Sequence, residues 1–449
     1  MKIKAFLYKT LAKSTISAYQ MYQLLRFASM VLISILLVKT GFSTGETSAF
    51  ELFVFIVNIV TFFWIMGISN SILSYYHQQD EKDKRFFFSN IFYLLQALGL
   101  ITAVAVYFTG AFGLATANTF LTGNKNLLIL SAYIFFYSPT LLIELYYILT
   151  ANNKALSKYG IIIFGLQFFI IAVTVFIFKD INMVFRGMLI WVLIRWLWTL
   201  HVLSGKKRKH TFMPVLIKTF ALTSIPVVIH ILLSNGMDYI DGILVDKYFP
   251  PDRFAVYRYG ARQFPLFVIM IGALRSVAIA KASENIKYAL VEIKEHSAKL
   301  MIFFFPLAIV LMFLSKSLFV FFFNEEYVYS ALLFNIYLLI LSSHIIIPEV
   351  FLYATKKYKV LMYLSGAELI FNLVLSLILM RYYGMAGIAF ATFIAFMVSK
   401  MFLVAYTKVK LRISPRAYLN TGRYVLLTVL LYVTFVISLY FNDFLNTIK

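Results

Sequence analysis

Residues 182–233 read NMVFRGMLIWVLIRWLWTLHVLSGKKRKHTFMPVLIKTFALTSIPVVIHILL, two long apolar runs joined by a short basic loop. A helix needs about 20 mainly apolar residues to cross the hydrocarbon core of a bilayer, and each run reaches this length. The loop GKKRKH (205–210) is the strongest basic run in the chain. Short loops rich in Lys and Arg stay on the cytoplasmic side of a membrane. The stretch therefore predicts two membrane-spanning helices joined on the cytoplasmic side.

The composition of the whole chain supports the same class. Of its 449 residues, 62% are hydrophobic and only 13% are charged, more apolar surface than a soluble protein of this length can bury. A net charge of +22 would suggest nucleic acid as the partner of a soluble protein. Here the positive residues lie in short loops between apolar runs, so we interpret them as topology signals and expect no nucleic-acid partner. The absence of cysteine excludes disulfides and thiolate metal sites.

The length rule predicts thirteen spanning helices. If the N-terminus is cytoplasmic, nearly all dense Lys/Arg clusters fall on one side of the membrane. The seventh span is longer than a straight helix needs, and Pro226 and Gly236 indicate a bend or break in it. Apolar residues at helical spacing in 281–299 predict a short helix on the cytoplasmic surface. The predicted spans are 17–39, 49–73, 86–109, 127–150, 158–178, 182–204, 214–246, 254–280, 299–322, 327–353, 359–381, 384–408 and 418–441.

The loop GKKRKH also divides the chain, because six predicted spans precede it and six follow before the last one. We therefore predict an all-α polytopic protein of a bacterial cytoplasmic (inner) membrane, with a cytoplasmic N-terminus. Its predicted domains are an N-terminal six-helix lobe (1–204), a basic linker (205–213), a C-terminal six-helix lobe (214–408) and a tail with one extra helix (409–449).

Three stretches carry a family resemblance. They are MGISNSILSYY (66–76), NGMDYIDGILVDKYFPPDRFAVYRYGAR (235–262) and NLVLSLILMRYYGMAGIAFAT (372–392), the last with an Asn-bearing helix and a Gly-x-x-Gly reversal. Their order and spacing resemble the polysaccharide-flippase (Wzx-like) branch of the multidrug/oligosaccharidyl-lipid/polysaccharide (MOP) flippase superfamily. The resemblance spans most of residues 15–408, and the chain departs from the family in having one added helix rather than none or two.

The resemblance implies a V-shaped pair of six-helix lobes around a central cavity, working by alternating access. It implies that the chain flips a lipid-(pyro)phosphate-linked oligosaccharide from the cytoplasmic to the outer leaflet, for polysaccharide, O-antigen or capsule biosynthesis. The implied partners are a polyprenyl diphosphate-linked oligosaccharide, membrane lipids and polysaccharide assembly proteins. No cofactor and no metal site are expected.

Arginines at membrane depth are the candidate substrate ligands, because buried ionisable residues are costly and mark pathways. Arg26 lies in the first predicted span, and Arg258 and Arg262 lie four residues apart in the eighth, on one predicted helical face. The planar arginine fork suits phosphate through two parallel hydrogen bonds. The resemblance likewise implies cavity arginines on the first and eighth helices. We therefore predict that Arg26 and Arg262 line a shared cavity and contact substrate phosphates.

Other buried charges are candidates for ion coupling or for structural ion pairs: Glu144, Arg195, Asp238 and Asp241. Asp238 and Asp241 share a predicted helical face, so either could hold Arg258 in a structural pair instead of leaving it to the substrate. Both interpretations of Arg258 stay open at this point. Arg186 lies near a helix start, where snorkelling to the interface explains it equally well.

Two other functions are compatible with a polytopic chain. A cation-coupled multidrug or metabolite exporter of the same superfamily often carries an acid in its first helix, whereas this first span carries Arg26 and no acid. A membrane-embedded polysaccharide polymerase would need catalytic residues, and the longest predicted outer loop, GAFGLATANTFLTGNKN, has no Asp, Glu, His or Arg. The chain also lacks P-loop, HExxH and GxSxG motifs. We therefore expect a transporter and not an enzyme.

Overall fold

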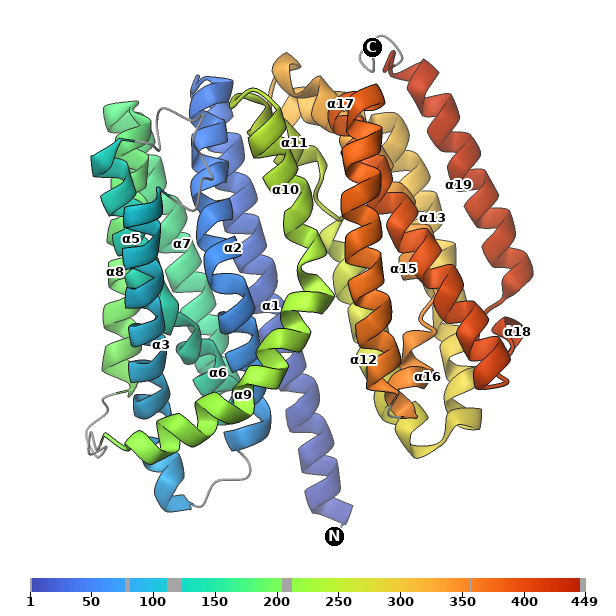
Figure 1. The fold of residues 1–449 in the computed structure, drawn as a ribbon, viewed down its shortest axis with the longest axis horizontal. Helices are drawn as coiled ribbons and strands as arrows, with labels where there is room; N and C mark the ends of the chain where they lie inside the picture. Colours follow the sequence, from blue (N-terminus) through green and yellow to red (C-terminus); the bar gives the residue numbers. More distant parts are fainter. Residues whose placement is uncertain (1, 77–80, 111–122, 204–211, 356, 445–449) are drawn as a thin grey trace. The chain divides into compact units, whose positions relative to one another are not determined.

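The computed structural model describes residues 2–76, 81–110, 123–203, 212–355 and 357–444 (Figure 1). Throughout these ranges all regular elements are helices, which confirms the predicted all-α class. The α-helices and 3-10 helices (η) are α1 (Lys2–Lys39), α2 (Thr44–Tyr75), α3 (Glu81–Thr109), α5 (Asn124–Tyr137), η3 (Ser138–Leu141), α6 (Leu142–Leu149), α7 (Asn153–Phe178), α8 (Ile181–Leu203), α9 (Pro214–Asn235), α10 (Met237–Tyr248), α11 (Arg253–Gly260), α12 (Pro265–Glu284), α13 (Ile286–Phe322), η4 (Glu325–Tyr327), α14 (Val328–Leu339), α15 (Leu341–His344), α16 (Glu349–Ala354), α17 (Tyr358–Lys410), α18 (Pro415–Tyr418) and α19 (Thr421–Phe441).

Within the described ranges, eleven helices are long and apolar enough to cross a membrane, as expected of a multi-pass membrane protein. One of them, α17, contains two predicted spans, 359–381 and 384–408. The predicted seventh span falls on α9 and α10, which are separated at Gly236 where its sequence indicated a break. The count of thirteen spans stays a prediction.

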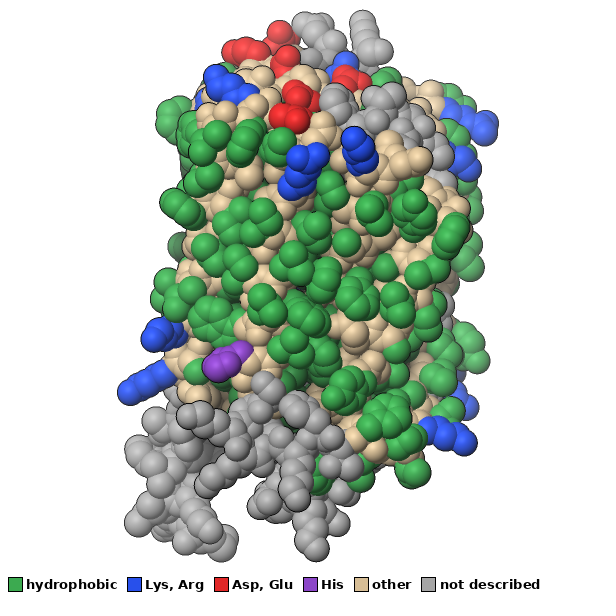
Figure 2. All heavy atoms as spheres, turned by 90° about the vertical axis from the view of Figure 1, so that its left-hand side faces the viewer, with side chains coloured by type: hydrophobic (Ala, Val, Ile, Leu, Met, Phe, Trp, Pro, Cys, Tyr) green, Lys and Arg blue, Asp and Glu red, His purple; other side chains and the backbone are tan. Residues whose placement is uncertain are grey.

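The surface in Figure 2 carries a broad band of hydrophobic side chains, and its described Lys, Arg, Asp and Glu side chains gather toward the two ends. The left-hand side of Figure 1, which faces the viewer here, includes α3, α5 and α8. On α3, Phe108 is 81% exposed and Ile101 is 65% exposed. Large apolar side chains are exposed in such numbers where the surrounding solvent is lipid.

The tight reversal predicted from Gly-x-x-Gly is present inside α17. Gly384 has φ 56° and ψ −139°, so the chain turns there between two helical segments. A side chain at Gly387 would collide with the backbone of Leu379, so the two segments can approach closely only because this residue is glycine. The reversal confirms that the predicted eleventh and twelfth spans are separate helical segments.

The predicted eighth span, 254–280, is not one continuous helix. It is divided into α11 and α12, with Ala261–Phe264 outside both. Pro265 explains the end of the break that adjoins α12, because proline disfavours helical geometry in the residue before it, and Phe264 is extended (φ −63°, ψ 118°). The expectation that Arg258 and Arg262 share one helical face is therefore wrong: Arg258 lies on α11 and Arg262 in the break.

The separate surface helix predicted for 281–299 is also corrected. Asn285 ends α12 and caps α13 by accepting a hydrogen bond from the Tyr288 backbone N–H. From there α13 continues without interruption to Phe322, so the amphipathic segment is the first part of a 37-residue helix. Lys281 and Glu292 form an ion pair across the junction of the two helices.

The chain divides into two compact units, in agreement with a two-lobe fold. Unit 1 comprises residues 1–232 and 246–253, and unit 2 comprises residues 233–245 and 254–449. In unit 1, α1 packs against α7, and α5 packs against α3 and α8. The predicted domain boundaries at 204 and 214 and the predicted V-shaped arrangement stay predictions.

In unit 2, α13 packs against α12, α14 and α19. The last helix is fixed to this bundle by polar contacts: Asn335 Nδ2 on α14 donates to Ser438 Oγ at 3.3 Å, and Asn442 Nδ2 donates to the Met312 carbonyl at 3.1 Å. The rings of Phe313 and Phe441 also meet edge to face. The extra C-terminal helix is thus an integral part of unit 2.

Candidate functional site

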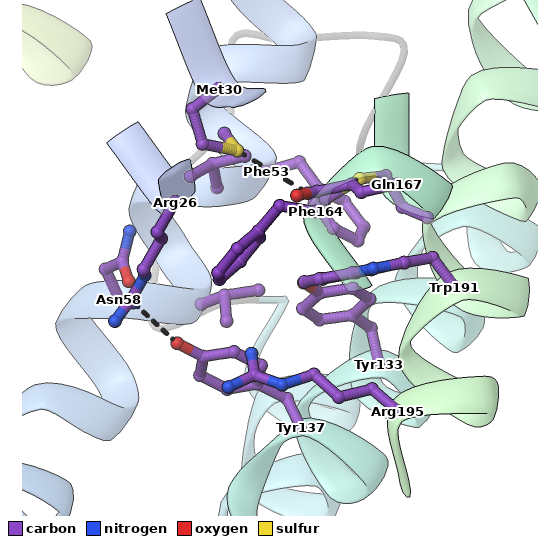
Figure 3. A pocket seen from close by; sticks show the side chains of 13 residues that line it. Arg26, Met30, Phe53, Asn58, Tyr133, Tyr137, Phe164, Gln167, Trp191 and Arg195 are labelled. Atoms are coloured by element: carbon purple, nitrogen blue, oxygen red, sulfur yellow. Dashed lines mark hydrogen bonds between the residues drawn. The ribbon is translucent and has the colours of Figure 1, made fainter. Parts of the chain in front are cut away.

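A cavity of about 110 Å³ lies inside unit 1 and brings together two of the predicted site residues (Figure 3). Its walls come from α1, α2, α5, α7 and α8. Aromatic and aliphatic side chains make up most of the lining, and the polar groups are two arginines, two amides and two tyrosine hydroxyls. The lining residues are Arg26, Met30, Phe53, Val54, Val57, Asn58, Tyr133, Tyr137, Phe164, Gln167, Met188, Trp191 and Arg195.

Arg26 reaches this cavity from α1. Its Nη2 donates a hydrogen bond to the hydroxyl of Tyr137 at 3.0 Å. Figure 3 shows the side chain of Asn58 beside the guanidinium group, on the neighbouring α2. The side chain of Arg26 is half-buried, and one hydroxyl is its only hydrogen-bond partner among the described residues. Most of its five N–H donors are therefore available to a ligand.

Arg195 enters from α8 and is 1% exposed. Its Nε donates to the Tyr159 hydroxyl and its Nη2 to the Tyr22 hydroxyl, both at 3.1 Å. The guanidinium carbon lies 5.7 Å from the ring centroid of Tyr137 and 5.6 Å from that of Trp191. Hydroxyls and aromatic faces stabilise the cation but do not neutralise it.

The opposite wall is fixed by Gln167 on α7. Its Oε1 accepts a hydrogen bond from Ser29 Oγ at 3.1 Å, and its Nε2 lies 3.6 Å from the Met30 sulfur. The indole N–H of Trp191 donates to the Ile163 carbonyl at 2.8 Å, which fixes the ring at the cavity wall. These bonds hold the polar lining in place before any ligand arrives.

The cavity has an excess of positive charge. Neither Arg26 nor Arg195 forms an ion pair with any carboxylate that the structure describes. Glu144 lies close enough to affect both electrostatically, but it does not line the cavity, and its Oε2 has no hydrogen-bond partner among the described residues. Uncompensated buried charge is costly, so the arrangement favours an anion in the cavity.

The position of Glu144 follows from a local break in the fourth predicted span. Pro139 cannot donate a backbone hydrogen bond, and the chain tightens into η3 before α6 begins at Leu142, which places Glu144 in the first turn of α6. The carboxylate is 7% exposed. Its predicted role in coupling or in an ion pair stays a prediction.

In unit 2, Asp241 is the centre of a second polar cluster. It is 4% exposed and accepts hydrogen bonds from the hydroxyls of Tyr257 at 2.9 Å and Tyr337 at 2.7 Å. Thr392 Oγ1 lies 2.8 Å and 3.0 Å from its two oxygens, and Asn372 Nδ2 donates to that threonine at 2.9 Å. Asp241 is therefore a buried carboxylate held by neutral groups, and its role in ion coupling stays a prediction.

The remaining predicted residues lie apart from the unit 1 cavity. Arg258 on α11 acts electrostatically on Asp241, and both its structural role and its substrate role stay predictions. Arg262 lies in the break before α12, with its guanidinium carbon 5.7 Å from the ring centroid of Tyr259. The side chain of Asp238 lies outside the described part of the structure. Because Arg26 and Arg262 belong to different units, their shared cavity stays a prediction.

Several site residues have no signal in the sequence, whereas one does. Tyr22, Tyr137 and Tyr159 hold the arginines, but tyrosine is too common in this chain to single them out. Lys400 is different: in unit 2 its Nζ donates to both carboxylate oxygens of Glu349 at 2.8 Å. It lies within the apolar run FIAFMVSKMFLVAY (393–406) and is a charge at membrane depth. Sequence reasoning could have found it by the same rule that selected the arginines.

No family model and no curated protein matches the chain. Its fold is similar to that of the lipid II flippase MurJ in an inward closed conformation, with a TM-score of 0.70 and 19% identity, covering 94% of this chain and 96% of that one. The fold is also similar to that of an inward-facing multidrug resistance MATE transporter of the MOP superfamily. The TM-score is 0.58 and the sequence identity 14%, over 85% of this chain and 96% of that one. A third similar structure is the MATE transporter VcmN of Vibrio cholerae in its bent form. Its TM-score is 0.54 and the sequence identity 14%, over 95% of this chain and 99% of that one.

The chain has the fold of MOP-superfamily transporters. At these identities the similarity concerns the fold. The three neighbours are named as flippases or transporters, not as enzymes. The polysaccharide-flippase branch within the superfamily stays a prediction.

Proposed function

We propose that the chain moves a lipid carrier, bearing a sugar on a phosphate or diphosphate group, from the cytoplasmic to the outer leaflet by alternating access. The observation that carries this proposal is the unit 1 cavity, in which Arg26 and Arg195 have no carboxylate partner among the described residues. The fold supports it, since one similar structure is a lipid II flippase. The proposed substrate is a polyprenyl diphosphate-linked oligosaccharide for polysaccharide biosynthesis in a bacterial inner membrane.

Under this proposal, we assign a role to each kind of side chain in the lining. Arg26 contacts the phosphate with its free donors, since a guanidinium binds two phosphate oxygens at once. Asn58 and Gln167 supply amide groups for sugar hydroxyls, and Trp191 supplies an aromatic face. Arg195, fixed by Tyr22 and Tyr159, adds positive charge in a largely apolar surrounding where electrostatic attraction is strong.

A multidrug exporter is supported less well by the same cavity. A cationic drug needs acidic or neutral acceptors, and the cavity lining contains no Asp or Glu. Two arginines would repel such a substrate at close range in a medium of low polarity. Glu144 lies nearby but does not line the cavity.

The test is a flipping assay in liposomes with a fluorescent polyprenyl diphosphate-linked sugar and a quencher added outside. The wild-type protein should expose label that empty liposomes protect. Arg26→Ala should lower the rate by about 10- to 100-fold, since a hydrogen bond to a charged group is worth about 1.5–3 kcal/mol. Arg26→Lys should recover only part of the rate, because a point charge loses the bidentate contact.

The matched control is Arg186→Ala, at an exposed arginine in unit 1 whose Nη1 lies 3.4 Å from the Met183 sulfur. It should flip lipid at the wild-type rate. Equal rates for Arg26→Ala and Arg186→Ala, at equal reconstituted protein, would remove the cavity from the mechanism. A wild-type protein with no flipping activity, together with drug-dependent transport, would favour the exporter instead.

A further inference from the structure

A second cavity, of about 160 Å³, lies inside unit 2. It is bordered by the break before α12, by α12 itself and by α14 and α15. Most of its wall is apolar, and the polar side chains in it are Gln263, Arg275, Tyr337 and His344. The full lining is Gln263, Phe264, Phe267, Val268, Ile271, Gly272, Arg275, Tyr337, Ile340, Leu341 and His344.

Arg275 belongs to a cluster of three charges from α12, α16 and α17, and α16 packs against both of the other helices. Glu349, the first residue of α16, is 7% exposed. Lys400 Nζ, from α17, donates to both carboxylate oxygens of Glu349 at 2.8 Å. Arg275 Nε, from α12, lies 3.0 Å from Glu349 Oε1.

The two cations do not share the carboxylate equally. Lys400 contacts both oxygens with hydrogen-bond geometry, whereas Arg275 Nε approaches one oxygen without the alignment of a hydrogen bond. These three side chains together carry a net charge of +1, and Glu368 acts electrostatically on Lys400 from the same helix. Lys400 is the better-bonded partner of Glu349, so Arg275, the member that lines the cavity, is the less fully compensated of the two cations.

The donors of Arg275 point to an unfilled site. Its Nη1 and Nη2 make no hydrogen bond with any residue that the structure describes, and the same holds for the side-chain amide of Gln263. His344 Nδ1 lies 3.2 Å from the Ile340 carbonyl, which leaves Nε2 without a described partner. No Asp or Glu lines the cavity. Free donors on a cation that shares its one carboxylate with a second cation, in a largely apolar wall, are suited to an anion.

We propose that the unit 2 cavity binds a phosphate-type anion on Arg275, with Gln263 and His344 as additional hydrogen-bonding groups and Glu349 and Lys400 setting the charge. The inference goes beyond the proposed function, because it is drawn from the charges of unit 2 alone. The ligand chemistry has two sources, free inorganic phosphate or diphosphate and the diphosphate of a lipid carrier. The test below separates them.

The experiment uses the natural absence of cysteine, which makes a single introduced cysteine a local reporter. Val268→Cys places a thiol on the cavity wall at a residue that is 47% exposed. The full-length protein in detergent is labelled with a small thiol reagent, and inorganic diphosphate is added against chloride at equal ionic strength. Bound anion should slow labelling at Val268→Cys in a saturable way.

Three second-site variants test the charge assignment. Arg275→Gln should weaken protection by at least about tenfold, as expected for loss of a charge-assisted pair of bonds. Lys400→Met should weaken it too, because Glu349 is then free to neutralise Arg275. Glu349→Gln should strengthen it, because the cluster then carries an additional positive charge. Arg381→Gln, at an exposed arginine on α17, is the matched control and should leave protection unchanged.

Opposite shifts in Lys400→Met and Glu349→Gln cannot come from general loss of structure, so they isolate the charge effect. Unchanged protection in Arg275→Gln, or shifts of the same sign in the other two, overturns the proposal. If Arg275→Gln does not fold, Arg275→Lys is measured instead, because lysine keeps the positive charge and loses the planar guanidinium group. Protection of the cysteine equal to that in the protein with Arg275 would then contradict the proposed site. Geranyl diphosphate protecting at lower concentration than inorganic diphosphate identifies the lipid headgroup as the source, and equal potency identifies the free anion.

Discussion

Arg195 and Tyr22 connect α8 to α1 in the interior of unit 1, with Arg195 Nη2 donating to the Tyr22 hydroxyl at 3.1 Å. Tyr22 is 0% exposed and its ring stacks with Tyr159, the second hydroxyl partner of the same arginine. A buried cation is thus held by two neutral hydroxyls on two other helices. The hydrogen bond between Arg195 and Tyr22 therefore contributes to helix packing in unit 1 and also fixes the position of a positive charge at its cavity.

Tyr22→Phe should destabilise the protein. The change removes a hydrogen bond to a buried charged group, and such bonds are worth about 1.5–3 kcal/mol. Thermal unfolding in detergent should show a lower midpoint than wild type. Tyr107→Phe, at an exposed tyrosine of α3, is the control and should leave the midpoint unchanged. A midpoint for Tyr22→Phe equal to that of the control would contradict the role of the hydroxyl.

The topology can be tested with the same cysteine-free background. From the distribution of basic loops, we predict that the N-terminus and GKKRKH are cytoplasmic and that KYFPPDR (247–253) is outside. Single cysteines at Ser204, which lies outside the described residues, and at Asp252 should react with an impermeant thiol reagent from opposite sides of the membrane. Labelling of both from one side would overturn the predicted orientation.

Gly384→Ala should destabilise the reversal inside α17. A residue with φ 56° and ψ −139° is costly for any side chain, by about 1–3 kcal/mol. Gly366→Ala, in the same helix and with open space around the added methyl, should instead be neutral or stabilising by up to about 1 kcal/mol. Unfolding midpoints that shift in the same direction for both variants would show that the positive φ is not what requires glycine.

Asp241→Asn should remove any response of transport to a Na⁺ or proton gradient. Asparagine keeps the shape of the side chain and can still accept bonds from Tyr257 and Tyr337, but it loses the negative charge that a cation requires. Flipping rates would be compared with and without an imposed gradient. Asp252→Asn, at a more exposed acid, serves as the control. A gradient response preserved in Asp241→Asn would exclude this carboxylate from coupling.

Membrane potential should accelerate outward flipping. A lipid diphosphate carries about two negative charges, so an inside-negative potential of 100 mV favours its export by roughly 4–5 kcal/mol if the charges cross the whole field. This holds if the cavity arginines stay nearly stationary while the lobes move around the site. Liposomes with a K⁺ diffusion potential, and no Na⁺ or pH gradient, provide the measurement. A rate independent of the size and sign of the potential would rule this out.

The sequence predicts local features of this fold well and spatial pairings poorly. Gly384 and Gly387 predict the reversal because glycine chemistry acts over a few residues. Arg26 and Arg195 each stand out as charges in apolar runs, but their meeting in one cavity depends on the packing of helices distant in sequence. Periodicity alone cannot show such a pairing, because it locates a residue on its own helix only.

The error at Arg258 and Arg262 has a specific cause. Their spacing of four residues indicates a common face only while the helix is continuous, and α11 ends at Gly260, between the two arginines. Pro265 predicts a boundary at Phe264, but that boundary follows both arginines and does not separate them. Arg275, Glu349 and Lys400 stand out in the sequence only as separate charges in apolar runs, since their helices are brought together by folding.

The absence of a carboxylate or imidazole from the described lining around the unit 1 arginines has a consequence for release. Arginine stays protonated, and tyrosine stays neutral, across the whole pH range in which cells live. The charge of a site built from these two kinds of side chain therefore does not change when the compartment on either side becomes more acidic or more alkaline. Under the proposed function, we therefore expect unloading to come from separation of the walls or from a competing anion, and not from a change of protonation in the lining itself.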